Sequence, residues 1–334
     1  MITKLVYIVV CGESDNYIEQ TALSAYSARK TNPDADILLI VDEATNNQIE
    51  GNRNVIMRYV SEKIVVSTPA EYDNKQKSRY LKTTLREHVK GDYLFIDSDT
   101  IITESLQFAD SLTMDIGAVL DVHLPLSASY YVDKVRIDAN KMGWNLTSKD
   151  ELYFNSGVMY VKDNETAHAL YKQWHENWKL RVSLGLVTDQ PALGMANAQL
   201  GYVIQELSGE WNCQLMLNGL PYLHRAKIIH YFSTSMNNKS KENYYFKNSN
   251  IYDQIRANGS IPDDVANMVG KARSAFQHEE MVIMSGKRAL FQYTPVIRML
   301  WKSFQSDGTI FRIYNLFGKI YYWIGGIRKK ILKK

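Results

Sequence analysis

The sequence predicts an α/β fold in which a mixed, mostly parallel sheet is flanked by helices and followed by a helical C-terminal appendage. Two patterns in the 334 residues indicate this fold. Short apolar runs alternate with stretches of helical spacing, as is typical of parallel sheets with helices on both faces. The apolar runs are continuous, which indicates strands buried on both sides. The hydrophobic fraction of 45% excludes a wholly disordered chain.

The elements are expected in the alternating order that this fold requires. Buried strands are expected over Leu5–Val10, Asp36–Val41, part of Asn54–Val66, Tyr93–Ile96, Ile116–Leu120, Val158–Val161 and Ala226–His230. Helices are expected over Tyr17–Lys30, which ends before an Asn-Pro-Asp breaker, and over Lys75–Val89, which Gly91 closes. Short helices and turns are expected between residues 233 and 286.

Three segments are expected along the chain: a core domain over residues 1–240, a polar and helical extension over 241–296, and a basic amphipathic tail over 297–334. The tail holds nine Lys and Arg residues and one Asp, a net charge of +8, whereas the rest of the chain carries −5. A nucleic-acid-binding protein more usually spreads its positive charge over a groove or face of the fold, so no nucleic-acid partner is expected.

The cysteine content and the N-terminal residues indicate the compartment. Two cysteines, Cys11 and Cys213, exclude a disulfide framework and a cysteine-based zinc site, which is typical of a reducing environment. The first residues do not resemble a secretory signal, and no apolar run is long enough to predict a spanning helix. We therefore expect a cytoplasmic protein.

Two carboxylates, Asp97 and Asp99, come directly after the expected strand Tyr93–Ile96. Ligand sites of open α/β sheets form at this carboxyl edge, and alternate residues there share a face, so both side chains can converge on one hard cation. A polar turn in which Asp99 or Thr100 only caps the next element is an open alternative. The pattern also resembles the Asp-x-Asp-x-Thr of haloacid-dehalogenase-like phosphatases, but Thr100 stands one position too early.

Several further segments point in one direction when they are taken in chain order. They are Asp15-Asn16-Tyr17, Lys82, Asp97-Ser98-Asp99, Asp121, Phe154-Asn155-Ser156-Gly157-Val158, Thr188-Asp189-Gln190-Pro191 and Ile229-His230. Together they resemble family eight of the nucleotide-sugar glycosyltransferases, which has the Rossmann-like GT-A fold and includes glycogenin and bacterial lipopolysaccharide galactosyl- and glucosyltransferases. The family's later Gly and Lys-Pro-Trp are missing, since Ser233 and Met236 stand there, and Lys239 is a candidate substitute at the pyrophosphate.

The resemblance implies a role for each of these positions. The implied metal ligands are Asp97, Asp99 and His230, an O,O,N set that suits Mn²⁺ or Mg²⁺. The implied donor-binding residues are Cys11, Asp15, Lys82, Asp97, Ser98, Asp121, Asn155 and Ser156. The implied catalytic residues beside the anomeric carbon are Asp189 and Gln190. Two alternatives stay open: Pro191 suits the first turn of a helix, which makes Thr188 or Asp189 an N-cap only, and Arg79 and Arg86 are interpreted as a solvated basic face.

The resemblance implies a metal-dependent, retaining hexosyltransferase that uses a UDP-sugar and a glycolipid or polysaccharide-precursor acceptor. Acceptor specificity is expected in Val122–Glu151 and after Ser233. A second hypothesis is a non-catalytic, metal-dependent sugar- or nucleotide-binding protein, and a third is the phosphatase.

The tail predicts a peripheral membrane contact. Its apolar residues lie at helical spacing beside cationic and aromatic ones: Ile310, Ile313, Phe317, Ile320 and Ile324, with Arg312, Lys319 and Trp323. This is the pattern of a helix that lies on an anionic membrane surface. It suits a lipid-linked acceptor and a place on the inner face of a bacterial cell membrane, as in the lipopolysaccharide relatives. A helix packed on the core domain or on a partner is the alternative.

Overall fold

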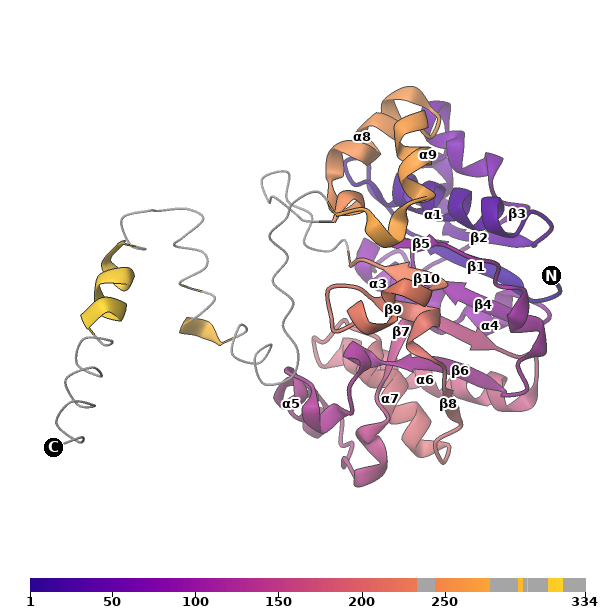
Figure 1. Ribbon diagram of the computed structural model, residues 1–334. Helices are drawn as coiled ribbons and strands as arrows, with labels where there is room; N and C mark the ends of the chain where they lie inside the picture. The colour runs from indigo at the N-terminus through magenta and orange to yellow at the C-terminus, as the bar shows by residue number, and fades with distance from the viewer. Residues whose placement is uncertain (233–243, 277–293, 297–298, 300–311, 321–334) are drawn as a thin grey trace, which may run out of the picture. The chain divides into compact units, whose positions relative to one another are not determined.

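The computed structural model describes residues 1–232, 244–276, 294–296, 299 and 312–320 (Figure 1). They belong to two compact units, Met1–Met281 and Val282–Lys334. The expected boundary at residue 240, together with Ser233, Met236 and Lys239, lies outside the described residues, as does most of the tail.

A seven-stranded sheet with the order β3-β2-β1-β4-β7-β6-β8 forms the centre of the first unit. Its strands are β1 (Lys4–Val9), β2 (Ile37–Asp42), β3 (Glu62–Val66), β4 (Tyr93–Ile96), β6 (Ile116–Leu120), β7 (Phe154–Val161) and β8 (Ile204–Glu206). Of these strands, β7 pairs antiparallel with both of its neighbours, and the other pairs are parallel. The mixed, mostly parallel sheet that the sequence predicts is confirmed.

Helices cover both faces of this sheet (Figure 1). They are α1 (Tyr17–Thr31), α2 (Glu43–Gln48), α3 (Asn74–Thr83), α4 (Leu85–His88), α5 (Val132–Lys141), α6 (Glu165–Ser183), α7 (Gln190–Gln199), α8 (Ser249–Asn258) and α9 (Asp263–Val269). Side chains of β1 alternate between two buried clusters, because successive residues of a strand point to opposite faces. Leu5, Tyr7 and Val9 pack with α1, α8 and α9, whereas Val6 and Ile8 pack with α3, α4, α6 and α7.

After the end of β4 the chain enters a second, three-stranded sheet. It has the order β5-β10-β9, with β5 (Thr100–Ile102), β9 (Cys213–Gln214) and β10 (Ile228–His230). The Oγ atoms of Ser24 and Ser27 on α1 bond to the Thr100 hydroxyl and the Ile102 N–H at 2.7 and 2.9 Å. Residues 97–99 lie between β4 and β5 and connect the two sheets.

Two expected elements differ from those observed. The helix expected over Lys75–Val89 is divided at Thr84 into α3 and α4. The strand expected over Val158–Val161 begins earlier, because residues 154–157 also belong to β7: Phe154 pairs with Leu120, and the Asp97 N–H donates to the Gly157 carbonyl at 2.8 Å. The partner strands supply the hydrogen bonds that make this polar segment extended.

Residues 244–276 share the core of the first unit. Ile251, Tyr252 and Ile255 of α8 are buried in the same cluster as α1. A buried glutamate adds a polar link, since Glu19 on α1 has no exposed surface and pairs with two arginines. Each arginine places its Nε 2.9 Å from Glu19 Oε1: Arg53 comes from the short helical segment Gly51–Arg58 that follows α2, and Arg256 comes from α8.

The described part of the second unit includes a helical stretch over residues 312–320. Its apolar side chains Ile313, Leu316, Phe317 and Ile320 are exposed. No helix among the described residues combines the length and apolar character needed to cross a bilayer.

Removal of the Glu19 carboxylate is expected to destabilise the first unit. Glu19→Ala leaves two arginines without their partner, and such a loss costs about 3 kcal/mol of unfolding free energy. Urea unfolding monitored by circular dichroism measures it. The matched control is Glu176→Ala, because Glu176 is an exposed glutamate that pairs with Lys179 on the surface of α6, and its loss costs below about 0.5 kcal/mol. Equal losses in the two variants would contradict the role given to Glu19.

Candidate active site

Three metal-ligating side chains meet where β4 crosses into the small sheet. Asp97, Asp99 and His230 each offer one ligand atom, and these atoms lie within 4.8 Å of one another. His230 stands opposite Thr100 in the pairing of β10 with β5, which brings its Nε2 to 3.1 Å from Asp99 Oδ1. The structure thus brings together the three residues that the sequence proposes as ligands.

The His230 ring is oriented by a buried amide. Asn212 donates from Nδ2 to Asn155 Oδ1 at 2.9 Å, so its own carbonyl oxygen faces His230 Nδ1 at 3.0 Å. His230 Nδ1 then donates to Asn212, and Nε2 is the ring nitrogen that faces the carboxylates. A hydrogen bond of this kind commonly fixes the tautomer of a metal-ligating histidine.

Gly157 is required by the close approach of β7 to this cluster. A Cβ atom there would lie 2.5 Å from His230 Cε1 and 2.7 Å from Asp97 Oδ2. These distances are shorter than van der Waals contact, so a side chain would displace the ligand atoms. The glycine of the Phe-Asn-Ser-Gly-Val segment is therefore required on steric grounds.

Asn155 links the three-residue cluster to Asp121. Its Nδ2 donates to Asp121 Oδ1 at 2.9 Å, and its Oδ1 also accepts the Gly157 N–H at 2.9 Å. Asp121 is 4% exposed, and its Oδ2 is buried without a hydrogen-bond partner among the described residues. Burial raises the pKa of this carboxyl to about 6, and the polar side chains of Asn155 and Gln190 offset only part of the shift. A buried acceptor without a partner suits a hydroxyl group of a ligand.

The backbone after Asp121 is strained. Val122 and His123 have φ angles of +52° and +55°, a left-handed conformation that a β-branched residue rarely adopts. Gln214, on β9, holds the turn with its amide, which accepts from the Val122 N–H and donates to the Leu120 carbonyl, both at 2.8 Å. Strain of this kind persists only where the surrounding contacts impose it. The sequence analysis missed Gln214, because its partners lie more than 90 positions away.

A second charged cluster surrounds Asp189. Its carboxylate lies 2.9 Å from Arg79 Nε and 3.7 Å from Lys82 Nζ, and it accepts from Ser156 Oγ at 3.0 Å. Lys82 Nζ also lies 3.3 Å from Asp97 Oδ1. Burial alone raises the pKa of Asp189, but Lys82 and Arg79 outweigh it and hold the pKa below its ordinary value. Asp189 is therefore charged at neutral pH.

Asp189 occupies the N-cap position of α7 without forming a cap hydrogen bond from its side chain. The interpretation of Asp189 as an N-cap only is thus wrong in this structure. The interpretation of Arg79 and Arg86 as a solvated basic face is also wrong. Arg79 pairs with Asp189, and Arg86 is 2% exposed at the opposite end of β4, where it donates to the Gly91 and Lys162 carbonyls. The i,i+3 spacing of Arg79 and Lys82 on α3 was the available signal.

The remaining expected donor-binding residues lie in or beside the β1–α1 connection. Cys11 is buried, and burial raises the pKa of its thiol to about 11. Asp15 accepts from the Gly12 and Tyr17 N–H groups at 2.6 and 3.2 Å, which shapes the loop. Ser98 accepts from the Thr21 hydroxyl at 2.8 Å, between the two aspartates of the β4–β5 crossing.

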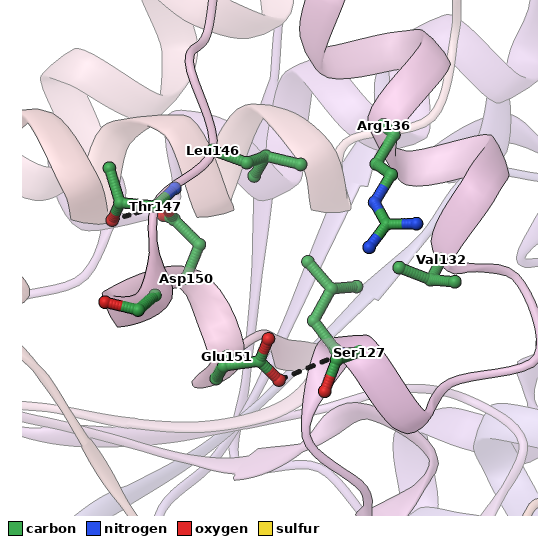
Figure 2. Close-up of a pocket in the computed structure, with 9 residues that line it drawn as sticks. Ser127, Val132, Arg136, Leu146, Thr147, Asp150 and Glu151 are labelled. Carbon is green, nitrogen blue, oxygen red and sulfur yellow. Dashed lines mark hydrogen bonds between the residues drawn. The ribbon is translucent and has the colours of Figure 1, made fainter.

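A separate pocket of about 250 Å³ lies in the segment between β6 and β7 (Figure 2). It is lined by Leu126, Ser127, Val132, Arg136, Leu146, Thr147, Ser148, Asp150 and Glu151. Glu151 Oε2 accepts the Ser127 N–H at 2.9 Å across it. None of these residues belongs to the cluster of Asp97, Asp99 and His230 or to the cluster around Asp189. The pocket lies within Val122–Glu151, where acceptor specificity is expected.

Solved structures that are similar to this chain include glycosyltransferases. The galactosyltransferase LgtC, solved in complex with donor and acceptor sugar analogs, is 16% identical, covers 79% of this chain and 99% of its own, and has a TM-score of 0.51. The bifunctional glycosyltransferase WbbM is 15% identical, with 81% of this chain covered and a TM-score of 0.50, and this chain spans about half (51%) of its length. Mouse xyloside xylosyltransferase 1 is 14% identical, covers 68% of this chain and 97% of its own, and has a TM-score of 0.46.

The sequence comparisons place the chain in a family. No curated protein sequence matches it significantly. The family model described as "Glycosyl transferase family 8" matches residues 8–239, a range from β1 to just beyond β10 that includes Asp97, Asp99, Asp121, Asp189 and His230. This match covers more than half of the chain and agrees with the GT-A fold of the galactosyltransferase LgtC, so the chain belongs to glycosyl transferase family 8.

Proposed function

We propose that this family 8 glycosyltransferase is a metal-dependent, retaining enzyme that transfers a hexose from a UDP-sugar to a glycolipid or polysaccharide-precursor acceptor. The observation that carries the proposal is the meeting, at one sheet edge, of the Asp97–Asp99–His230 cluster with the carboxylates of Asp121 and Asp189. Lys82 and Asn155 connect the three parts.

The proposed metal ligands fit a divalent cation such as Mn²⁺ or Mg²⁺. Two carboxylates and one imidazole whose Nε2 faces them provide an O,O,N donor set. A cation held by Asp97, Asp99 and His230 would supply Lewis-acid stabilisation of the charge that develops on the leaving diphosphate.

The chain's own residues supply the remaining charge complementarity. Arg79 and Lys82 lie on one face of α3, where Lys82 reaches both Asp97 and Asp189, and their cations suit diphosphate oxygens. Asp121 offers sugar hydroxyls an acceptor oxygen that has no partner in the described part of the chain, and Asn155 offers them an amide. The Asp189 carboxylate, charged and held within the site, suits an anomeric carbon that gains positive charge, and Gln190 adjoins it with its amide carbonyl.

We further propose that the tail contacts the inner face of a bacterial cell membrane. Residues 312–320 expose Ile313, Leu316, Phe317 and Ile320, whose spacing places them along one side of the helix. Arg312 and Lys319 supply the cations that an anionic surface attracts. A lipid-linked acceptor confined to that surface would meet the enzyme at a raised local concentration.

Donor hydrolysis tests the proposed activity. We expect slow UDP release from one member of a panel of UDP-sugars, lost with EDTA and reduced at least about 100-fold in Asp97→Asn, because a metal ligand is removed. The matched control is Asp92→Asn, since Asp92 precedes β4 at its other end and should leave the rate unchanged. Absence of both UDP release and Mn²⁺-dependent UDP binding by calorimetry would contradict the proposal.

The buried charge of Asp121 predicts a stability that depends on pH. Its pKa rises from 3.8 to about 6 on folding, so the folded state binds a proton more tightly and stability falls as pH rises through this window. Asp121→Asn should therefore be more stable than the unaltered protein, by up to about 3 kcal/mol at pH 7.5 and about 1 kcal/mol at pH 4.5. Donor hydrolysis should fall in the same variant. Urea unfolding at both pH values checks this, and an equal difference at the two would contradict it.

Vesicle binding tests the tail. The full chain should sediment with vesicles that contain anionic lipid, and deletion of residues 310–334 should abolish this. Phe317→Glu should weaken binding about tenfold or more, because an apolar contact is lost and a like charge is added. Asn315→Glu adds the same charge at an exposed polar position and should have a smaller effect. Unchanged binding after the deletion would overturn the proposed contact.

A further inference from the structure

Three buried side chains of α6 donate to three successive carbonyls of the segment that precedes α7. Trp178 Nε1 donates to the Val187 carbonyl at 3.1 Å, Arg181 Nε to the Thr188 carbonyl at 2.7 Å, and Trp174 Nε1 to the Asp189 carbonyl at 3.0 Å. Trp174, Trp178 and Arg181 are at most 1% exposed. Their spacing of four and three positions places them in one row along the helix.

The segment 187–189 depends on this row because it lies in neither a helix nor a strand. The Val187 and Thr188 carbonyls therefore have no partner in a regular ladder, and the donors on α6 satisfy them. The Asp189 carbonyl also accepts the Leu193 N–H at 3.1 Å, so the backbone of Asp189 is held from two sides, by α6 and by the first turn of α7.

We propose that Trp174, Trp178 and Arg181 are positioning residues that hold Asp189 in register with Arg79 and Ser156. The proposal rests on the proposed function, in which Asp189 lies beside the reacting carbon. The Asp189 carboxylate lies 2.9 Å from Arg79 Nε and 3.0 Å from Ser156 Oγ, and a shift of its backbone by about 1 Å would break these contacts. Misplacement of that size in a catalytic group can cost about 100-fold in rate.

Arg181 also anchors the row to a third element. Its Nη2 donates to the Thr188 hydroxyl at 2.7 Å and to Asp138 Oδ2 on α5 at 2.9 Å. Asp138 is 7% exposed, so it compensates the buried guanidinium charge. The segment before Asp189 is therefore tied through Arg181 both to α6 and to α5, which lies in the β6–β7 segment that also forms the pocket.

The experiment compares two buried arginines: Arg181, which contacts the segment 187–189, and Arg86, which lies beside the start of β4. Arg181→Met and Arg86→Met each remove a guanidinium that donates to main-chain carbonyls and pairs with an aspartate. With the donor identified by UDP release, Arg181→Met should lower kcat about 10- to 100-fold and leave KM for the donor within about twofold. Arg181→Lys should recover part of kcat. Arg86→Met should lose thermal stability comparably, with kcat unchanged at a temperature where both variants are folded.

Trp178→Phe and amide hydrogen exchange test the positioning role in two further ways. Trp178→Phe removes one N–H donor and keeps an aromatic ring, and should lower kcat severalfold. Amide hydrogen exchange followed by mass spectrometry should show faster exchange in peptides covering residues 186–193 of Arg181→Met but not of Arg86→Met. An unchanged kcat in Arg181→Met, or the same exchange in both arginine variants, would overturn the positioning role. If the unaltered protein turned over no donor, the proposed function would fail, and hydrogen exchange alone would decide whether Arg181 holds the segment.

Discussion

The antiparallel pairing of β7 with β4 is the interaction on which the site depends. The pairs of β7 with β4 and β6 are antiparallel whereas the other pairs of the seven-stranded sheet are parallel, and this reversal brings the beginning of β7 to the edge where β4 and β6 end. The hydrogen bond from the Asp97 N–H to the Gly157 carbonyl closes that edge at 2.8 Å. Asn155 and Ser156 then stand beside Asp121 and Asp189, which the chain reaches only after β6 and before α7. The reversed direction of β7 therefore brings polar groups from four separate parts of the sequence to one edge of the sheet.

Part of this arrangement could be predicted from local patterns, and part could not. Strands such as β1, β2 and β4 are continuous apolar runs, so their place in a buried sheet followed directly from burial on both faces. Asp97 and Asp99 were predictable because they end such a run. The metal role proposed for His230 required the resemblance, since a histidine at a strand end carries no local signal. Phe154–Gly157 contains Asn and Ser and looks like a turn until its pairing partners are known.

The residues that sequence analysis missed share a physical cause. Gln214 contacts the turn at Val122 across 92 positions, and Arg256 contacts Glu19 across 237. Such contacts depend on the tertiary fold and leave no periodicity in the sequence. Arg79 is different, since its spacing from Lys82 already placed both cations on one helix face. The helical spacing does not reveal that Asp189, far along the chain, is the acidic partner that makes this helix face part of a buried cluster.

Asp121 and Asp189, the two carboxylates proposed to contact the donor sugar, are held in opposite ways, and the difference follows from their partners. Asp189 is surrounded by Arg79, Lys82 and Ser156, so its charge is compensated and the folded state favours the ionised form. Asp121 is buried just before a strained turn, and one of its oxygens has no hydrogen-bond partner among the described residues, so its ionisation costs stability. A ligand hydroxyl that donates to Asp121 would recover part of that cost only when bound. Binding of such a hydroxyl would thus convert part of the cost of ionising Asp121 into binding free energy.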